Sequence, residues 1–343
     1  MKTVFSPVQL THDPKMEISD GMLKPAVEIP SRAEMVRNEI LARKIGPLWT
    51  PQDFGRAPLE RVHSGEYLDF LENFWSLWTA AGRQGEAFPF VWPVRQLRAT
   101  PTPTHIDGML GRFSFDAGTP LGEHTWAAAT ASANSALTAA RFLREGDRSA
   151  FALCRPPGHH AAADYFGGYC FLNNAAIAAQ WLRDQGTARV AILDVDYHHG
   201  NGTQAIFYDR ADVMFLSIHA GPKEEYPYFL GHADETGEKA GKGFTQNWPL
   251  PPGTDWARYA QALEEACRWL TVYSPDVLIV SLGLDTYEKD PISQFRFVPE
   301  DFLRLGARLA RLGKPTLFVM EGGYAVDALG SNCVNVLEGF LGG

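Results

Sequence analysis

The residues best suited to chemistry lie in the segment ILDVDYHHGNGT, residues 192–203. An apolar run at 190–193 predicts a buried strand, which ends in a dense group of ionisable side chains and a glycine-rich turn. Asp196 and His198 are two residues apart, so on an extended backbone they point to the same side. A carboxylate beside an imidazole at a strand end makes half of a zinc or manganese site. Four ionisable groups within six residues are too many for an ordinary polar turn.

Three other apolar runs also end in reactive side chains. The run at 151–154 leads to His159 and His160, the run at 279–282 to Asp285, and the run at 316–320 to Tyr324. Because the carboxyl ends of parallel strands meet at one edge of a sheet, these residues are predicted to converge on one crevice. Convergence would supply Asp285 as a third metal ligand beside a tandem histidine pair and a tyrosine.

The alternation of elements predicts the fold class. Short apolar strands are expected at 3–6, 151–154, 190–194, 213–217, 277–282 and 316–320, with helices at 124–143, 173–184, 256–273, 299–312 and 326–340. Two earlier helices are expected, one opening on a capping box at Ser31 and Glu34 and one at 64–81. Strand–helix alternation predicts an α/β fold in which an open parallel β-sheet carries helices on both faces. A single domain over residues 1–343 is the simplest arrangement.

The composition narrows the class of protein further. The chain of 343 residues is 45% hydrophobic and 21% charged, which is ordinary for a globular enzyme, and its net charge of −9 argues against nucleic acid as a partner. It has no run of about 18 apolar residues and no signal-peptide core, so a membrane span is not expected. The four cysteines have no CxxC spacing, which indicates free thiols and a cytoplasmic location.

Residues 82–120 interrupt the alternation of helices and strands. This segment is rich in proline and glycine and carries Phe88, Phe90, Trp92 and Phe113. It is too long and too aromatic for a plain linker, and loops of this length are usually functional. Flexible disorder is the alternative that its aromatic content disfavours.

Five motifs together resemble the histone deacetylase superfamily, which has the arginase–deacetylase fold. They are RPPGHH (155–160), GYCFLNN (168–174), DVDYHHGNGT (194–203), SLGLDTYEKDP (281–291) and EGGY (321–324). VHSGEYLDFL (62–71) resembles a helix in the first half of that family. Within the superfamily the chain is most similar to bacterial acetylpolyamine amidohydrolases, by KMEISDGML (15–23) and by the insertion with HIDG at 105–108.

The resemblance implies a metal-dependent deacetylation. Asp196, His198 and Asp285 would hold one Zn²⁺, although Fe²⁺, Co²⁺ or Mn²⁺ fit the same ligand types. In that reaction His160 would act as the general base and later as the general acid, with Asn201 as its hydrogen-bonding partner. His159, oriented by Asp194, would give electrostatic support. Tyr324 would donate a hydrogen bond to the oxyanion. His199 would point to the face of the strand opposite to His198, so it would support the site without binding the metal.

The resemblance also implies further sites. A structural K⁺ would lie against Asp194, Ser217 and main-chain carbonyls near Asp196, His198 and Ile218. The implied substrate-binding residues are Glu17, Asp107, Phe166, Gly168, Tyr169 and Tyr226, with Tyr165 as a further wall candidate. The insertion at 82–120 would reach across a homodimer and narrow the channel.

Two positions depart from that subfamily. Asp107 stands where relatives have a glutamate, and Gly118 stands where they carry an acid, with Asp116 nearby. The resemblance implies a small cationic acetylated amine of the acetylputrescine or acetylcadaverine type as the substrate, and the two departures bear on which particular amine is preferred. The alternatives are a broad acetyl-lysine protein deacetylase, a non-catalytic binder of acetylated amines and a two-manganese arginase-like enzyme.

Overall fold

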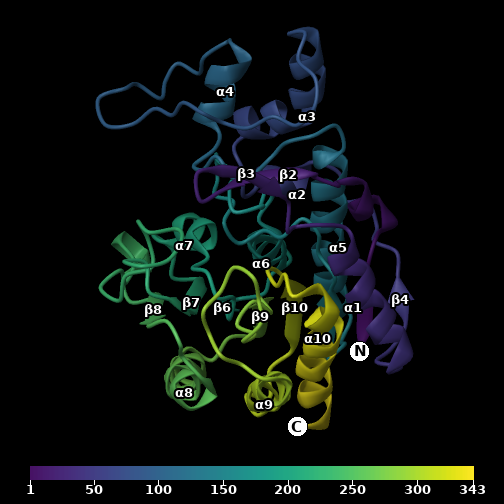
Figure 1. The fold of residues 1–343 in the computed structure, drawn as a ribbon. Coiled ribbons are helices and arrows are strands. Elements are labelled where there is room, and N and C mark those ends of the chain that lie inside the picture. The colour runs from purple at the N-terminus through teal and green to yellow at the C-terminus, as the bar shows by residue number, and fades with distance from the viewer.

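The computed structural model describes all 343 residues and contains one large parallel sheet (Figure 1). Its eight strands run in the order β4-β1-β5-β10-β9-β6-β7-β8, and every neighbouring pair is parallel. The strands are β1 (Lys2–Val4), β4 (Leu48–Trp49), β5 (Ser149–Ala152), β6 (Val190–Asp194), β7 (Val213–Ala220), β8 (Thr245–Leu250), β9 (Val277–Leu282) and β10 (Thr316–Met320). The predicted fold class is confirmed.

Helices cover both faces of this sheet because side chains alternate along each strand. In β6, Val190 and Ile192 join one core while Ala191 and Leu193 join the other. The first core is completed by α2 (Ala57–Glu60), α3 (Gly65–Ala80), α4 (Ile106–Arg112), α5 (Thr125–Arg144), α6 (Asn174–Asp184) and α7 (Asn201–Phe207). The second is completed by α1 (Ser31–Ala42), α8 (Trp256–Tyr273), α9 (Pro299–Ala310) and α10 (Val326–Gly342).

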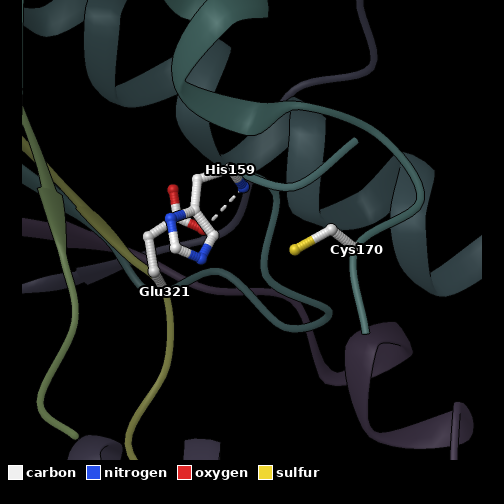
Figure 2. A group of neighbouring side chains, drawn as sticks. All are labelled: His159, Cys170 and Glu321. Atoms are coloured by element: carbon white, nitrogen blue, oxygen red, sulfur yellow. Dashed lines mark hydrogen bonds between the residues drawn. The ribbon is translucent and has the colours of Figure 1, made fainter. Parts of the chain in front are cut away.

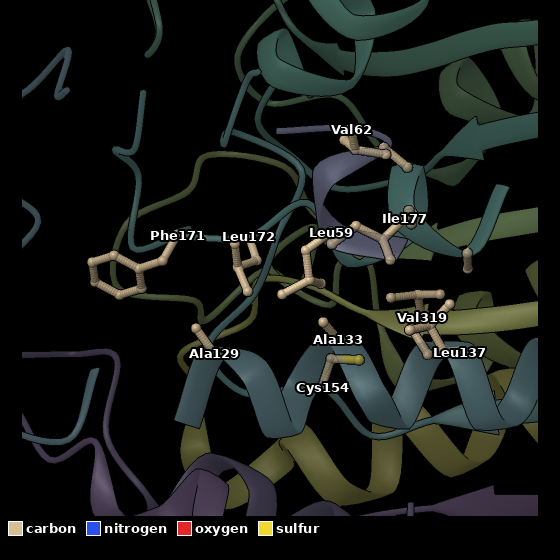
Figure 3. Close-up of a cluster of buried hydrophobic side chains, with 14 of the residues drawn as sticks. Leu59, Val62, Ala129, Ala133, Leu137, Cys154, Phe171, Leu172, Ile177 and Val319 are labelled. Carbon is tan, nitrogen blue, oxygen red and sulfur yellow. The ribbon is translucent and has the colours of Figure 1, made fainter. Parts of the chain in front are cut away.

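Small side chains let α5 lie close to the rest of the first core. Its buried face carries Ala129, Ala133 and Leu137, which pack among Leu59, Ile177 and other apolar side chains from separate segments (Figure 3). This close packing holds α5 against β5, the strand that precedes the loop 153–160. That loop carries the histidine pair of the site.

The expected elements are found with small shifts at their ends, and several others were not predicted. The 3₁₀ turns η1 (Pro7–Thr11) and η2 (Lys239–Gly241), the hairpin β2 (Met16–Ser19) and β3 (Met22–Pro25), and the edge strands β4 and β8 belong to this group. β8 reads TQNWPL, which lacks an apolar run and contains a proline. The predicted capping box at Ser31 and Glu34 is wrong, because Pro30 already has helical φ and ψ and no side chain caps α1.

The insertion at 82–120 is partly helical. It contains α4 and rejoins the body of the protein through bridges at Ala87 and Ser114. In Figure 1, α3, α4 and the long loop before α4 project beyond the end of the sheet. Four large apolar side chains of this loop are exposed: Phe90, Val91, Val94 and Leu97. No helix of the structure combines the length and apolarity needed to cross a bilayer.

A buried ion cluster ties α1 to the loop after β5. The Glu28 carboxylate accepts from Arg32 at 2.7 Å and lies 3.0 Å from Nε of Arg155. All three side chains are almost completely buried. Burial favours the neutral acid, but the two guanidinium groups outweigh it and lower the pKa of Glu28.

Replacing Glu28 with glutamine should therefore destabilise the protein by about 3–5 kcal/mol, because two buried cations lose their counter-charge. Since the folded-state pKa is depressed, this stabilisation is present above the unfolded value of about 4.3 and disappears as the pH falls through the folded-state pKa. Urea unfolding at several pH values measures it. The control is Glu39→Gln on α1, whose partly exposed pair with Arg43 should contribute about 1 kcal/mol or less. Equal losses for the two variants would contradict this interpretation.

Candidate active site and metal centre

The candidate site lies where the direction of strand connection changes. β6 leads outward to β7 and β8, whereas its neighbour β9 leads the opposite way to β10. Parallel sheets place their ligands in the crevice beyond the carboxyl ends of strands at such a point. Asp196 and His198 follow β6, and Asp285 follows β9. The register pairs Asp194 with Ser281, which brings the two strand ends level.

Asp196, His198 and Asp285 converge. Each offers one ligand atom, and these atoms all lie within 4.8 Å of one another. Nδ1 of His198 is 3.0 Å from Oδ2 of Asp285 and 3.3 Å from Oδ1 of Asp196. Two carboxylates and one imidazole are ligand types that Zn²⁺ binds in proteins, so the donor set fits a catalytic zinc site.

Main-chain N–H groups hold the two carboxylates in place. Asp196 accepts from His198 N at 2.9 Å and from Gly322 N at 2.8 Å, and Asp285 accepts from Tyr197 N at 2.9 Å. Burial disfavours the protonated imidazole, but the two carboxylates outweigh burial and raise the pKa of His198 to about 10. Burial and the charge of Asp196 raise the pKa of Asp285 to about 7. Both shifts reflect a buried surplus of negative charge that attracts a proton or a cation.

The two histidines after β5 have different partners. His159 Nδ1 lies 2.9 Å from Asp194, and His160 Nδ1 lies 2.7 Å from Asn201 Oδ1. Burial lowers the pKa of His159, but Asp194 and Asp196 outweigh it and raise the value to about 10. Burial and the neighbouring His159 and His198 push the pKa of His160 well below its ordinary value. The pair therefore combines one cationic and one neutral imidazole at pH 7.

Glu321 fixes the main chain that carries this pair. Its Oε2 accepts from Gly158 N at 2.7 Å. It also accepts from His159 N at 3.1 Å, the bond drawn in Figure 2. Cys170 lies close to both His159 and Glu321, and these three residues form a second group with metal-ligand types. Burial raises the pKa of Cys170 well above its ordinary value, so the thiol is protonated. A thiol makes a poor metal ligand, and we assign this group to support of the loop.

Tyr324 follows β10 and packs against Arg32. The buried guanidinium lies 4.7 Å from the centre of the Tyr324 ring. It also donates to the carbonyls of Gly323 at 2.6 Å and Glu321 at 2.7 Å. Burial raises the pKa of Tyr324 well above its ordinary value, so the phenol keeps its proton. Nothing in the sequence around Arg32 distinguished it from an ordinary helix residue.

A cavity of about 550 Å³ opens onto these groups. Its lining includes His160, His198 and Tyr324, together with Gly168, Tyr169 and Tyr226. Phe166, predicted as a wall, is fully buried in the first core instead, and neither it nor Tyr165 lines the cavity. Phe115 supplies that wall, stacked against Tyr226 with ring centres 5.7 Å apart. The sequence placed Phe115 within the insertion, and nothing there separated it from other aromatic residues.

Two acids that were predicted to bind substrate, Glu17 and Asp107, do not line the cavity. Glu17 is buried behind the wall and accepts from the Tyr169 hydroxyl at 3.1 Å and from Val27 N at 3.0 Å. Burial raises the pKa of Glu17. Asp107 lies on α4, pairs with Arg83 at 2.9 Å and is not part of the cavity lining. The acids that do line the cavity are Asp20, Asp116 and Glu225.

The residues predicted to surround K⁺ lie on, or just after, two neighbouring strands. Asp194 pairs with Ser217 in the β6–β7 register, and Ile218 follows Ser217. All five predicted residues are buried. Ser217 Oγ lies 2.8 Å from Nδ1 of His219 and 3.4 Å from Nδ1 of His199. β6 ends at Asp194, so the alternation of side chains does not reach His199. Its ring packs against Phe215, on the face of the sheet that carries Ile192 and not on the opposite face that was predicted.

Comparison with known proteins identifies the family. The histone deacetylase domain matches residues 26–340, so the chain belongs to this family and is a deacetylase. Acetylpolyamine amidohydrolase 2 of Pseudomonas aeruginosa is 56% identical over 342 residues, which cover 100% of this chain and 99% of that protein. Acetylpolyamine amidohydrolase of Mycoplana ramosa is 45% identical over 343 residues and all of both chains.

Solved structures agree with this membership. The crystal structure of acetylpolyamine aminohydrolase from Burkholderia pseudomallei superposes with a TM-score of 0.94 at 43% identity, over 99% of this chain and 98% of that chain. The HD domain of HDA15 gives a TM-score of 0.82 at 27% identity, over 99% and 88%. The arginase–deacetylase fold inferred from the motifs is therefore confirmed.

Replacing Gly168 with alanine should abolish most of the activity. Gly168 has φ +54°, and a Cβ there would overlap the imidazole of His160. Displacing a reacting group by about 1 Å can cost about 100-fold in rate, so kcat should fall by about that factor. The control is Gly313→Ala, which has a similar φ of +65° and open space around its Cβ. The left-handed backbone should cost both variants stability, and Gly168→Ala should lose more because of the overlap. An equal loss of kcat in both would contradict the proposed contact.

Proposed function

We propose that this deacetylase hydrolyses small cationic acetylated amines, namely acetylated diamines or polyamines, to acetate and the free amine. The observation that carries the proposal is the charge of the cavity wall. The lining includes Asp20, Asp116 and Glu225 and contains no lysine or arginine. A channel walled by carboxylates attracts a cationic ligand and disfavours an anionic one. The names of the relatives in Pseudomonas and Mycoplana point to the same substrates.

The walls suit the methylene part of such a substrate. Phe115, Tyr169 and Tyr226 present aromatic surfaces on the way to His160 and Tyr324. Apolar walls bury a slender alkyl chain, and a small number of polar groups fix its ends. The distal ammonium would then remain near the acidic part of the lining while the acetyl group enters.

A single metal ion would be held by Asp196, His198 and Asp285, and we propose zinc. Bound there, it would act as a Lewis acid toward the acetyl carbonyl and the attacking water. The two carboxylates balance the charge of a divalent cation, which supports this assignment. A structural K⁺ beside Asp194 and Ser217 is proposed on the same reasoning of buried negative charge.

His160 is proposed as the general base and later the general acid. Its Nδ1–H donates to Asn201, which leaves Nε2 as the nitrogen that accepts a proton in the cavity. Because its pKa is lowered, the imidazole is neutral and able to accept that proton at pH 7. His159, held cationic by Asp194, would support developing negative charge without exchanging its proton.

The insertion at 82–120 is proposed to contact a second copy of the chain. Phe90, Val91, Val94 and Leu97 expose a concentrated apolar surface on the projecting loop. Exposed apolar patches of this kind are typical of protein interfaces. Asp107, predicted to bind substrate, lies away from the cavity of its own chain, so it would reach a substrate only through such a dimer.

A kinetic panel on the metal-loaded protein tests the substrate class. N-acetylputrescine, its neutral isostere N-pentylacetamide and an acetyl-lysine peptide should be compared by kcat/KM. We expect the cationic diamine to be preferred over the neutral amide by at least about tenfold, because the acidic side chains of the lining attract the distal ammonium. The preference should weaken at high salt, where exposed charges are screened. A peptide turned over as fast as acetylputrescine would indicate a broad acetyl-lysine deacetylase instead.

Tyr324→Phe tests the proposed oxyanion donor. Removing one such donor typically costs about 100- to 1000-fold in kcat, because the hydrogen bond strengthens only in the transition state. The substrate KM should change much less, since the ring and its contact with Arg32 remain. Steady-state kinetics measure both constants. A variant with a raised KM and unchanged kcat would assign Tyr324 to binding alone.

A further inference from the structure

Asp116 occupies a central place in the cavity wall. Its Oδ1 accepts from Gly118 N at 3.0 Å and from Thr119 N at 3.1 Å. Its Oδ2 accepts from Gly168 N at 2.6 Å and from the Tyr226 hydroxyl at 2.7 Å. One carboxylate therefore joins three segments that are far apart in sequence, and all four of its hydrogen-bond donors are neutral.

Both distant partners of Asp116 touch His160. Gly168 lies so close to the imidazole that a Cβ would overlap it. The Tyr226 ring meets the imidazole edge-on, with ring centres 5.1 Å apart. Phe115, next to Asp116, stacks on Tyr226 and lies 6.5 Å from the same imidazole. The surroundings of His160 on the cavity side are thus set by the segment that Asp116 anchors.

The turn beside His160 needs this external support. Gly168 and Tyr169 have φ values of +54° and +64°, and the left-handed region is unfavourable for a residue that carries a side chain, such as Tyr169. The amide of Gly168 is held by Asp116, and the amide of Tyr169 donates to Thr119 Oγ1 at 3.0 Å. Residues 116–119 therefore hold both amides of the strained turn.

We propose that Asp116 is a positioning residue for deacetylation, which fixes the Gly168–Tyr169 turn and Tyr226 against His160. This inference rests on the proposed role of His160 as general base. Asp116 does not touch the reacting atoms itself. Its effect is on the distance between the imidazole and the substrate, which kcat reports more directly than KM does.

Asp116→Asn is the variant that tests the proposal. The amide has the same shape, but its NH₂ group donates and cannot accept. Either the Gly118 and Thr119 amides or the Gly168 amide therefore loses its acceptor. We expect kcat to fall about 10- to 100-fold on both N-acetylputrescine and N-pentylacetamide, with smaller changes in KM. Amide hydrogen exchange of the 165–170 peptide should become faster. Tyr226→Phe, which removes one of the four bonds and keeps the ring, should lower kcat in the same direction but less.

The matched control is Asp20→Asn. It removes the same charge from the same cavity lining, but Asp20 pairs with Lys24 and makes no bond to the turn. It should act on the KM of the cationic amide. If Asp116→Asn behaves like Asp20→Asn, or if exchange of the 165–170 peptide is unchanged, the positioning role is wrong. Should Asp116→Asn fail to fold, an undiminished kcat in Tyr226→Phe overturns it.

Failure of the substrate proposal would be visible separately. A wild-type enzyme that prefers N-pentylacetamide would refute the cationic specificity before any variant is compared. The loss of kcat in Asp116→Asn on the neutral amide would still decide the positioning role.

Discussion

Buried negative charge at the junction of β6 and β9 is the constraint on which the site depends. Asp196 and Asp285 face one imidazole nitrogen within hydrogen-bonding distance, away from solvent. Buried carboxylates are costly unless they are paired with a cation and held by donors. Main-chain amides of Tyr197, His198 and Gly322 provide the donors, and a divalent cation would provide the remaining charge. Strand order brings these groups together, because β6 and β9 are neighbours although their sequences lie far apart.

Around that centre the structure separates charges by depth. At the bottom, Asp194 holds His159 cationic, while Asn201 offers His160 only a neutral acceptor. Two adjacent histidines thereby acquire different protonation states from their partners alone. Nearer the opening, the cavity wall carries three acids and no lysine or arginine, although Asp20 pairs with Lys24 outside the lining. Under the proposed function, one channel would draw in a cation and still keep a neutral base next to the amide that is cleaved.

The sequence predicted those parts of the site whose positions follow from strand ends. Asp196, His198 and Asp285 follow buried strands, so periodicity and parallel topology sufficed to bring them together. Phe166 was assigned to the wall from its nearness to a motif, yet it packs in the core, and Phe115 takes its place. Which of two nearby aromatics faces a cavity depends on how the insertion folds back, and local patterns do not encode that. The roles of Arg32 and Asp116 were also out of reach, since each depends on contacts with segments more than 50 residues away.

The central claim is that Asp196, His198 and Asp285 together form one metal site. Titration of chelator-treated protein with Zn²⁺ in a calorimeter tests it most directly, with Asp285→Asn and Glu39→Gln measured alongside. The account predicts one tight zinc per chain in the wild type and in Glu39→Gln, and loss of that tight binding in Asp285→Asn. Zinc binding of equal stoichiometry and affinity in Asp285→Asn would contradict it.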